Sequence, residues 1–463
     1  MMDPLLLQAA KIASQYLEHV DDRPVGIPPD RDRLEQALGP DLTDDGEPAE
    51  TVIDSLGRTA SDGLVASAGG RFFGFVVGAN LPVSVAADWL VSAWDQNTGF
   101  DVLSPTGAVI EQITGRWLKE LLNIPNEAAI GFVTGCQMAN FMALAAARQD
   151  LLDRQGWDVA LQGLNQAPPL RLITSAQSHG TIDRAFAMLG LGADRPIRIP
   201  CDDQGRMLVD RLADALQHET TPAIVCAQAG NVDSGSFDRL KEIGCLCKQH
   251  EAWLHIDGAF GLWAAASPQL RSAAEGAELA DSWATDAHKW LNVPYDSGIV
   301  AVRNADALIR STRYRGDYLV RGRDVDDPYM FTPESSRRAR AIPIFAALKT
   351  LGRNGVAQLV ERCCERARQM SQLLAAGGME IVNDVVLNQV LFRIPPTGTA
   401  SDDDFTAELL TRIQRDGTCW LGGTVWKGRR AMRISVSSWR TTPEDIHRSA
   451  DAILRQWRIM QQE

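Results

Sequence analysis

The first part of the chain has apolar residues at helical spacing. Between Pro4 and Val20 they recur every three or four positions, as on one face of an amphipathic helix: Leu5, Leu6, Ala9, Ile12, Ala13, Tyr16 and Leu17. Such a face is a packing surface, and a terminal helix of this kind can pack on its own subunit or across a second one. The residues that follow, 21–50, are rich in Asp, Pro and Gly and predict a connector.

From about residue 70, apolar runs of strand length alternate with helical patterns. AAIGFVTG leads into MANFMALAAARQDLL, LRLITSA leads into TIDRAFAML, and PAIVCAQAG, AWLHIDGAFG and SGIVAVR follow as further strands. This alternation is typical of βαβ units and predicts a mostly parallel sheet covered by helices. Because ligands of such sheets bind where strands end at their carboxyl edges, the polar residues there are the candidate site.

The pattern changes again near residue 345. Residues 345–378 predict one or two amphipathic helices, MEIVND, NQVLFRI and MRISVSS predict a smaller sheet, and a last helix is expected from about Pro443. The chain is therefore predicted to have three parts. These are an N-terminal helical segment (1–70) that packs on a dimer partner, a large domain (71–345) and a small C-terminal α+β domain (346–463).

Composition excludes several classes of function. The 463 residues are 45% hydrophobic and 23% charged, as in a globular protein of two or three domains. A net charge of −13 argues against nucleic-acid binding, which needs a basic face. No apolar run approaches the roughly 20 residues that span a bilayer, and no signal-peptide pattern is present. The eight cysteines lack zinc-ligand spacing, so we expect reduced thiols, a cytoplasmic location and no metal site.

Four polar segments lie at or just after predicted strands. They are VTGCQMAN (133–140), SAQSHGTIDRA (175–185), HIDGAFG (255–261) and DAHKW (286–290). Lys289 lies 32 positions after Asp257, which leaves room for one helix and another strand. Both side chains can therefore reach a common crevice at the carboxyl edge of the sheet.

This ordered set resembles the fold-type I pyridoxal phosphate (PLP) enzymes, and specifically the group II amino-acid decarboxylases. That family includes the aromatic amino-acid, tyrosine, histidine and glutamate decarboxylases. The combination of HIDGAFG with DAHKWLNVPYDSG is the most specific part, and the resemblance extends from about residue 70 to 350. It implies a mostly parallel, seven-stranded α/β sheet flanked by helices, with PLP as the cofactor.

The resemblance also implies how the cofactor ring is held. Lys289 matches the lysine that holds the cofactor's aldehyde as a Schiff base. Asp257 matches the aspartate that pairs with the pyridine nitrogen, where a carboxylate keeps the ring protonated and able to accept electrons. Ala259 is expected to pack under the ring, and His179 to stack on its other face as a catalytic residue.

The cofactor phosphate is expected at the start of the helix that follows VTG. The implied contacts are Thr134, Gly135 and Cys136, through backbone N–H groups at a helix N-terminus, and His288. The sequence departs from the family here, because Cys136 and Gln137 replace a second Gly and a Ser or Thr. Backbone donors survive this change, whereas a hydroxyl contact does not.

A stretch of mixed charge with few apolar residues, RGDYLVRGRDVDDPYMFTPESS, resembles the family's loop over the active site. In the family this loop carries the tyrosine that protonates the carbanion after CO2 leaves. Tyr329 lies about where that tyrosine falls and is the implied catalytic acid, with Tyr318 as the alternative. Our prediction is therefore a general acid on this loop.

The substrate end of the site is less well defined by the sequence. Phe73, Phe75 and Ser104 lie in segments that resemble those closing the family's pocket, and they are the candidate substrate contacts. Arg337 and Arg338, in the segment SSRRARA, can be structural or functional. No arginine is clearly placed to bind a side-chain carboxylate, which disfavours an acidic substrate.

We therefore predict a homodimeric PLP-dependent decarboxylase of an L-amino acid with an aromatic or apolar side chain. Its active site is expected at the subunit interface, and its products are the amine and CO2. The altered loops at 134–137 and 229–231 motivate an alternative on the same scaffold, namely oxidative decarboxylation to an aldehyde, transamination or aldol-type cleavage. A third reading is a cofactor-binding scaffold without activity, which the presence of both Lys289 and Asp257 argues against.

Overall fold

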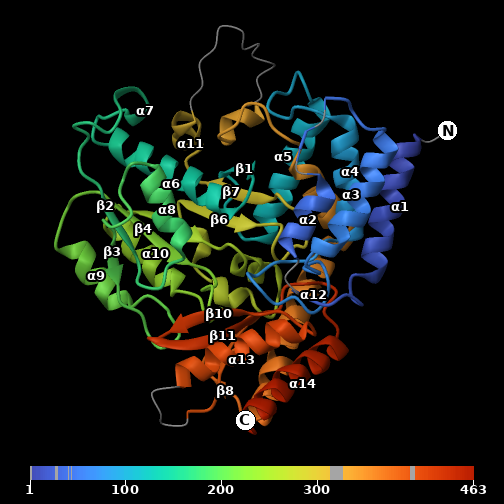
Figure 1. Cartoon of the computed structure of the whole chain (residues 1–463). Coiled ribbons are helices and arrows are strands. Elements are labelled where there is room, and N and C mark those ends of the chain that lie inside the picture. Colours follow the sequence, from blue (N-terminus) through green and yellow to red (C-terminus); the bar gives the residue numbers. More distant parts are fainter. Residues whose placement is uncertain (1–2, 27–29, 40, 43, 313–326, 397–401) are drawn as a thin grey trace.

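The computed structural model describes residues 3–26, 30–39, 41–42, 44–312, 327–396 and 402–463. The predicted first helix is α1 (Pro4–His19), whose start is capped by the Asp3 side chain. None of the described residues of α1 is buried, and α1 packs beside α3 (Ala49–Gly63) at the edge of the molecule (Figure 1). The predicted connector contains a short helix, α2 (Arg31–Leu38), because the Asp30 side chain caps its first turn.

A seven-stranded sheet forms the centre of the molecule, with strand order β1-β7-β6-β5-β4-β2-β3. The strands are β1 (Ala129–Val133), β2 (Arg171–Ser175), β3 (Ile197–Ile199), β4 (Ala223–Gln228), β5 (Trp253–Asp257), β6 (Ser282–Asp286) and β7 (Gly298–Val302). Among the described strands, β7 pairs antiparallel with both β1 and β6, and the other pairings of this sheet are parallel. The predicted mostly parallel α/β sheet is thus confirmed. Strands β4 to β7 are buried along their whole length, as expected when helices cover both faces.

Two hydrophobic clusters fill the space between this sheet and its helices. Side chains of each strand alternate between them, so that Ile224 and Cys226 lie in one cluster and Val225 and Ala227 in the other. The first cluster includes α6 (Cys136–Asp153), α8 (Gly180–Met188) and α11 (Ala305–Ser311). The second includes α5 (Pro105–Leu121), α9 (Val209–Gln217), α10 (Leu240–Gln249), α12 (Ala341–Ala376) and α14 (Pro443–Met460). The remaining elements are α4 (Pro82–Trp94), α7 (Val159–Gln162), η1 (Gly261–Ala266), η2 (Arg271–Ala274), η3 (Ala277–Leu279) and η4 (Pro328–Phe331).

A four-stranded antiparallel sheet lies beside the larger one, with order β10-β11-β9-β8 (Figure 1, orange and red). Its strands are β8 (Glu380–Ile381), β9 (Gln389–Arg393), β10 (Gly422–Trp426) and β11 (Arg429–Ser435), and α13 (Asp402–Asp416) packs against it. Helix α12 contacts β8 and β9 of the small sheet and the helices α4 and α5 of the larger part, and its helical geometry is interrupted at Gly352. The predicted boundary between residues 345 and 346 falls inside α12, and the division into three domains stays a prediction.

Candidate active site

The ends of three strands meet the starts of two helices at one pocket. It has a volume of about 240 Å³ and lies at the carboxyl ends of β4, β5 and β6, next to the first residues of α6 and α8. All four polar segments of the sequence contribute to it. Its lining is Gly135, Cys136, Gln137, His179, Thr181, Gln228, Gly230, Val232, Asp257, Ala259, Phe260, Asp286, His288 and Lys289.

Lys289 and Asp257, the two residues on which the prediction depends, line this same pocket. Lys289 Nζ lies 3.2 Å from Asp286 Oδ2. Burial acts to lower the pKa of Lys289, but the negative charges of Asp286 and Asp257 outweigh it and raise that pKa above its ordinary value. The amine is therefore held as an ammonium in this arrangement.

The Asp257 carboxylate is held in place by neutral donors. The backbone N–H of Ala259 donates to Asp257 Oδ1 at 3.2 Å, and Cys136 Sγ lies 3.5 Å from the same oxygen. Burial, together with the charges of Asp257 and Asp286, raises the pKa of the Cys136 thiol well above its usual value. The thiol therefore stays protonated and can donate to the carboxylate.

His288 is oriented by contacts at both ring nitrogens. The Ser297 N–H donates to Nδ1 at 3.2 Å, which leaves the proton of the neutral ring on Nε2. Nε2 lies 3.3 Å from Asp286 Oδ1, and the ring stacks on Tyr295 with centroids 4.2 Å apart. Burial lowers the pKa of His288, although the charge of Asp286 opposes this shift. The lowered pKa favours the neutral ring.

The N-terminus of α6 forms one side of the pocket. Gly135 precedes this helix, and a Cβ atom there would lie 3.1 Å from His288 Cε1, so the backbone approaches the histidine closely. The Cys136 N–H donates to Asp286 Oδ1 at 2.5 Å, which gives the helix start a carboxylate partner. Of the predicted phosphate contacts, Gly135, Cys136 and His288 line the pocket, whereas Thr134 is absent from its lining.

His179 and Ala259 also line the pocket, as the sequence predicted. His179 precedes α8 with its side chain exposed, and Nδ1 lies 2.8 Å from Thr181 Oγ1. Partial burial lowers the pKa of this histidine. A histidine ring that faces an open pocket has a face available for a flat ligand.

Several lining residues were not identified from the sequence. Asp286 was within the quoted DAHKW motif, but nothing in the motif indicated its contacts with Lys289, His288 and the start of α6. Gln228 ends β4, and its buried Nε2 has no hydrogen-bond partner among the described residues. An orphaned donor in a pocket wall is expected where a ligand supplies the acceptor.

Other predicted residues lie away from this pocket in the single chain. Phe73 is 1% exposed within the core, whereas Phe75 is 65% exposed and stacks on Trp420 with centroids 5.3 Å apart. Ser104 is buried just before α5. The predicted substrate contacts of these residues stay predictions.

Tyr329 lies on η4, packed against Phe100 with ring centroids 4.8 Å apart, and it lines a different cavity together with Arg148 and Thr312. Its N–H donates to the Gly99 carbonyl at 2.9 Å. Tyr318, the alternative catalytic acid, lies outside the described residues. The predicted general acid therefore stays a prediction.

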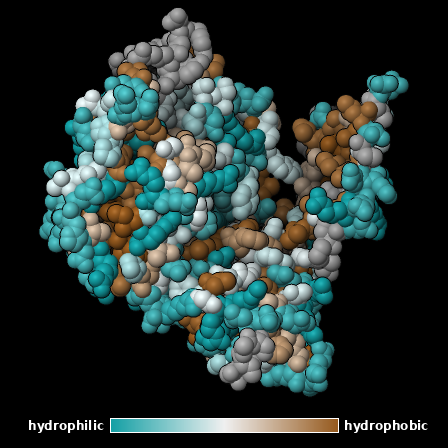
Figure 2. All heavy atoms as spheres, turned by 60° about the vertical axis from the view of Figure 1, so that its left-hand side comes forward, coloured by the Kyte–Doolittle hydropathy of each residue, from teal (hydrophilic) through white to brown (hydrophobic). Residues whose placement is uncertain are grey.

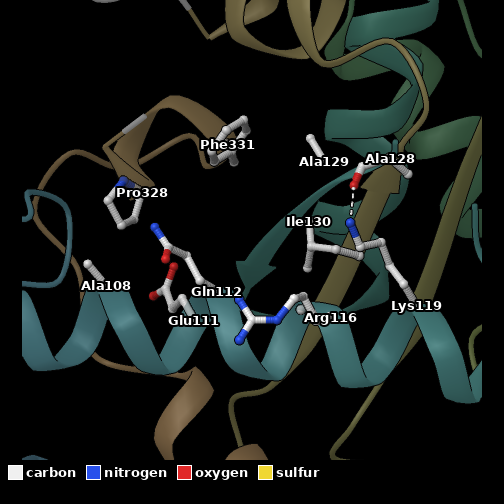
Figure 3. A pocket seen from close by; sticks show the side chains of 11 residues that line it. Ala108, Glu111, Gln112, Arg116, Lys119, Ala128, Ala129, Ile130, Pro328 and Phe331 are labelled. Atoms are coloured by element: carbon white, nitrogen blue, oxygen red, sulfur yellow. Dashed lines mark hydrogen bonds between the residues drawn. The ribbon is translucent and has the colours of Figure 1, made fainter. Parts of the chain in front are cut away.

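A further cavity of about 290 Å³ lies between α5, the edge strand β1 and η4 (Figure 3). Its lining includes Glu111, Arg116 and Lys119 and none of the predicted site residues. The Lys119 ammonium donates to the Ala128 carbonyl at 3.1 Å, and both oxygens of Glu111 bind Arg337, at 2.6 and 2.8 Å. Glu111 and Lys119 are thus engaged in contacts within the fold. Because the cavity also contains none of the predicted site residues, it is not the candidate active site.

A lysine amine and a carboxylate lie in one pocket, at the carboxyl edge of a mostly parallel sheet and beside a helix N-terminus, which is the arrangement that the resemblance to fold-type I PLP enzymes implies. The model of the pyridoxal-dependent decarboxylase conserved domain matches residues 32–395. The chain belongs to this family, and PLP is its cofactor. The predicted enzyme class and cofactor are thus confirmed.

The relatives cover almost the whole chain. It is 31% identical over 464 residues to the aromatic-L-amino-acid decarboxylase of Bacillus atrophaeus, covering 96% of this chain and 93% of that protein. It is 26% identical to the 4-hydroxyphenylacetaldehyde synthase of Rhodiola rosea, covering 89% of this chain and 85% of that protein. The crystal structure of Oryza sativa TDC with PLP and tryptamine superposes with a TM-score of 0.92 at 23% identity, covering 99% and 100% of the two chains. The fold class is thereby confirmed. No helix within the described part of the chain is long and apolar enough to cross a membrane.

Proposed function

We propose that the protein decarboxylates an L-amino acid with an aromatic or apolar side chain and releases the amine and CO2. The observation that carries this proposal is that Lys289 and Asp257, from separate segments, line one pocket. The similarity to an aromatic-L-amino-acid decarboxylase supports the substrate class. Apolar side chains in the pocket wall, Val232 and Phe260, support it as well.

The donor set of the pocket fits the cofactor. In our proposal Lys289 holds the aldehyde, Asp257 pairs with the ring nitrogen, and His179 and Ala259 lie on the two ring faces. The phosphate would be held at the start of α6 by the predicted contacts Thr134, Gly135 and Cys136, together with His288. Gln137, which also lines the pocket, would add a further contact at this helix start. When bound, PLP supplies an electron sink for the electron pair left behind as CO2 departs. The orphaned Nε2 of Gln228 and the close approach at Gly135 are consistent with a ligand in this position.

Two proton movements follow from these contacts. The Lys289 ammonium has to lose a proton before the amine can act as a nucleophile, and Asp286 Oδ2, at 3.2 Å, is positioned to accept it. After CO2 leaves, a general acid has to return a proton to the substrate carbon that carried the carboxylate. We retain Tyr329 for this role because it lies in the segment that resembles the family's active-site loop.

The test uses purified protein loaded with PLP and each common amino acid in turn. We expect CO2 release with an aromatic or apolar substrate and the visible absorbance of bound cofactor. Lys289→Ala is expected to abolish both, and Asp257→Asn to keep some cofactor but lose turnover. Lys241→Ala, which removes an exposed lysine paired with Glu275, is the matched control and should behave as wild type. Full turnover by Lys289→Ala would refute the proposal.

An aldehyde-forming reaction is the second candidate. The similarity to a 4-hydroxyphenylacetaldehyde synthase favours it, as does the altered loop at 229–231, whose Gly230 lines the pocket. Quantifying CO2, amine, aldehyde and keto acid from one reaction separates the two candidates. Amine and CO2 in equal amounts, with no aldehyde and no keto acid, would eliminate oxidative decarboxylation and transamination together.

We further propose a homodimer with the active site at the subunit interface. Large apolar side chains are exposed on the N-terminal part of the chain, including Leu6 (62%) on α1, Trp94 (48%) on α4 and Leu103 (53%). Figure 2 shows apolar side chains, in brown, in several areas of one face of the molecule. Exposed apolar side chains that gather on a surface mark interfaces. Light scattering on Leu6→Asp/Trp94→Asp tests the proposal, because a wild-type dimer should become a monomer.

A cytoplasmic location completes the proposal. All eight cysteines, which lie within the described residues, are free, as expected for a protein kept in a reducing compartment. We propose that its partners are an amino acid as a small-molecule substrate and a second copy of the chain, with neither nucleic acid nor membrane as a partner. Cell fractionation with an antibody against the native protein would test the location, and an exclusively secreted protein would contradict it.

A further inference from the structure

Behind the Asp257 carboxylate lies a chain of buried polar side chains that the proposed reaction does not use. Trp253, His255 and Asp257 alternate along β5 and so project toward the same face of the sheet. That face is covered by α6, which contributes Asn140, and Ser282 lies on the neighbouring strand β6. Asn140, His255 and Ser282 are completely buried, although each carries polar atoms.

Hydrogen bonds connect these side chains into one path. The Trp253 Nε1–H donates to Ser282 Oγ at 2.9 Å, and Ser282 Oγ lies 3.0 Å from His255 Nδ1. His255 Nε2 lies 2.9 Å from Asn140 Oδ1. The path ends at the Asn140 amide nitrogen, 3.5 Å from Asp257 Oδ2 and 3.3 Å from Thr181 Oγ1.

The donors of this path are arranged in a single direction. Asn140 Oδ1 can only accept, so His255 Nε2 carries the ring proton. Burial lowers the pKa of His255 to about 4, so the ring is neutral and has one N–H group. His255 Nδ1 therefore accepts from the Ser282 hydroxyl, whose oxygen accepts from Trp253. This assignment follows from the network, and every polar group in the path is satisfied by it.

The consequence for the site is that the Asn140 amide cannot rotate freely. With Oδ1 engaged by His255, its NH2 group points toward Asp257 and Thr181. The Thr181 hydroxyl in turn lies 2.8 Å from His179 Nδ1. The Asn140 amide thus contacts Asp257, which we propose pairs with the ring nitrogen. Through Thr181 it also connects to His179, which we propose stacks on the ring.

We propose that Asn140, oriented by His255 and Ser282, is a positioning residue that fixes the Asp257 carboxylate and, through Thr181, the His179 imidazole. The inference rests on the proposed roles of Asp257 and His179. The contact to Asp257 is long at 3.5 Å, so Asn140 acts on orientation, and such contacts often tighten when a ligand binds. Neutral donors suit this task, because a cation here would compete with the protonated ring for the carboxylate.

The experiment compares two substitutions at His255 that differ only in hydrogen bonding. His255→Gln keeps a donor that can reach Asn140 Oδ1, whereas His255→Leu removes it at a similar volume. We expect His255→Leu to weaken PLP binding about tenfold, because the Asn140 amide is no longer held with its NH2 group toward the Asp257 carboxylate and one hydrogen bond to a charged group is lost. His255→Gln should stay within about threefold of wild type. Binding is measured by cofactor titration of the PLP-free protein, without reference to turnover.

A second measurement reads the ring nitrogen directly. With ¹⁵N-labelled PLP bound, the ring-nitrogen chemical shift reports protonation, and we expect a smaller protonated fraction in His255→Leu than in His255→Gln. Asn388→Leu is the control, because it removes a buried amide just before β9 that donates to the Val436 carbonyl and the Ser437 hydroxyl. It should lower thermal stability and leave both cofactor readouts unchanged.

The outcomes separate this inference from the proposed function. If wild-type protein binds no PLP, or Lys289→Ala binds it unchanged, the proposed function fails. If wild type binds PLP and His255→Leu equals His255→Gln in affinity and ring-nitrogen shift, the inference is overturned. Should His255→Leu not fold, Ser282→Ala removes only the hydroxyl that orients the histidine. A ring-nitrogen shift in Ser282→Ala identical to wild type would then overturn the inference.

Discussion

The buried pair between Arg337 and Glu111 allows a quantitative test of how the fold around the site is held. The two guanidinium nitrogens of Arg337 contact the two carboxylate oxygens of Glu111 at 2.6 and 2.8 Å, and the side chains are 1% and 9% exposed. Removing one member of such a pair leaves a buried charge without a partner. Arg337→Met is therefore expected to lower the free energy of unfolding by about 3–5 kcal/mol.

The pH dependence of this loss has a defined sign. Burial already raises the pKa of Glu111 above its usual value, although Arg337 opposes the shift, and the pKa rises further once Arg337 is gone. A carboxyl group whose pKa is raised on folding favours the folded state at low pH and loses that contribution as pH rises through its folded pKa. The loss of unfolding free energy in Arg337→Met, relative to wild type, should therefore be largest at neutral pH. It should shrink as pH falls toward 4.5, the ordinary pKa of Glu.

The assay is urea unfolding of the PLP-free protein, followed by fluorescence at pH 7.5 and 5. Arg338→Met is the control, because its partly exposed pair with Asp88 should contribute less than about 1 kcal/mol. The double variant Glu111→Leu/Arg337→Met should recover most of the loss, since an apolar replacement of a buried pair is often neutral. A double variant no more stable than the single one would refute the reasoning.

Three further predictions follow from the site. Gly135→Ala should weaken PLP binding about tenfold in a cofactor titration, because its Cβ would lie 3.1 Å from His288 Cε1, closer than most Cβ contacts. Since burial lowers the pKa of His255 from 6.5 to about 4, the unfolding free energy should fall by about 3 kcal/mol as pH drops between those values. In denaturant titrations at several pH values, the unfolding free energy of His255→Gln should not show this fall between pH 6.5 and about 4. Tyr329→Phe should lower kcat about 10²-fold with little change in KM if Tyr329 is the general acid, and a kcat equal to wild type would exclude it.

Much of the fold follows from local pattern. Five strands of the large sheet, β1, β2, β4, β5 and β7, could be predicted because each is a short apolar run bounded by polar or small residues. Neither β6 nor β3 was identified from the sequence, and only one of the three residues of β3 is buried. The interruption of α12 at Gly352 accounts for a stretch that predicted either one helix or two. The helix α2 was missed because the Asp- and Pro-rich composition around it indicated a connector, although Asp30 was present as a capping residue.

The site was predictable to the extent that its residues belong to contiguous motifs. Lys289 and Asp257 were found this way. The role of Asp286 was not, because its contact with the Cys136 N–H joins residues 150 positions apart. Phe73 and Phe75 show the same limit, since nothing local indicates that one is buried and the other stacks on Trp420.

Helix α12 has a consequence for any attempt to treat this protein as modular. It packs on α4, α5 and η1 of the larger part and on α14, β8 and β9 of the smaller one. A cut at residue 345 would leave only the first five residues of α12 with the N-terminal fragment. The buried side chains of Ala347 and Leu348 would then lie on the other fragment. Chimeras that exchange the C-terminal sheet between relatives should therefore leave α12 uncut, with the junction placed before Ala341 or beyond Ala376.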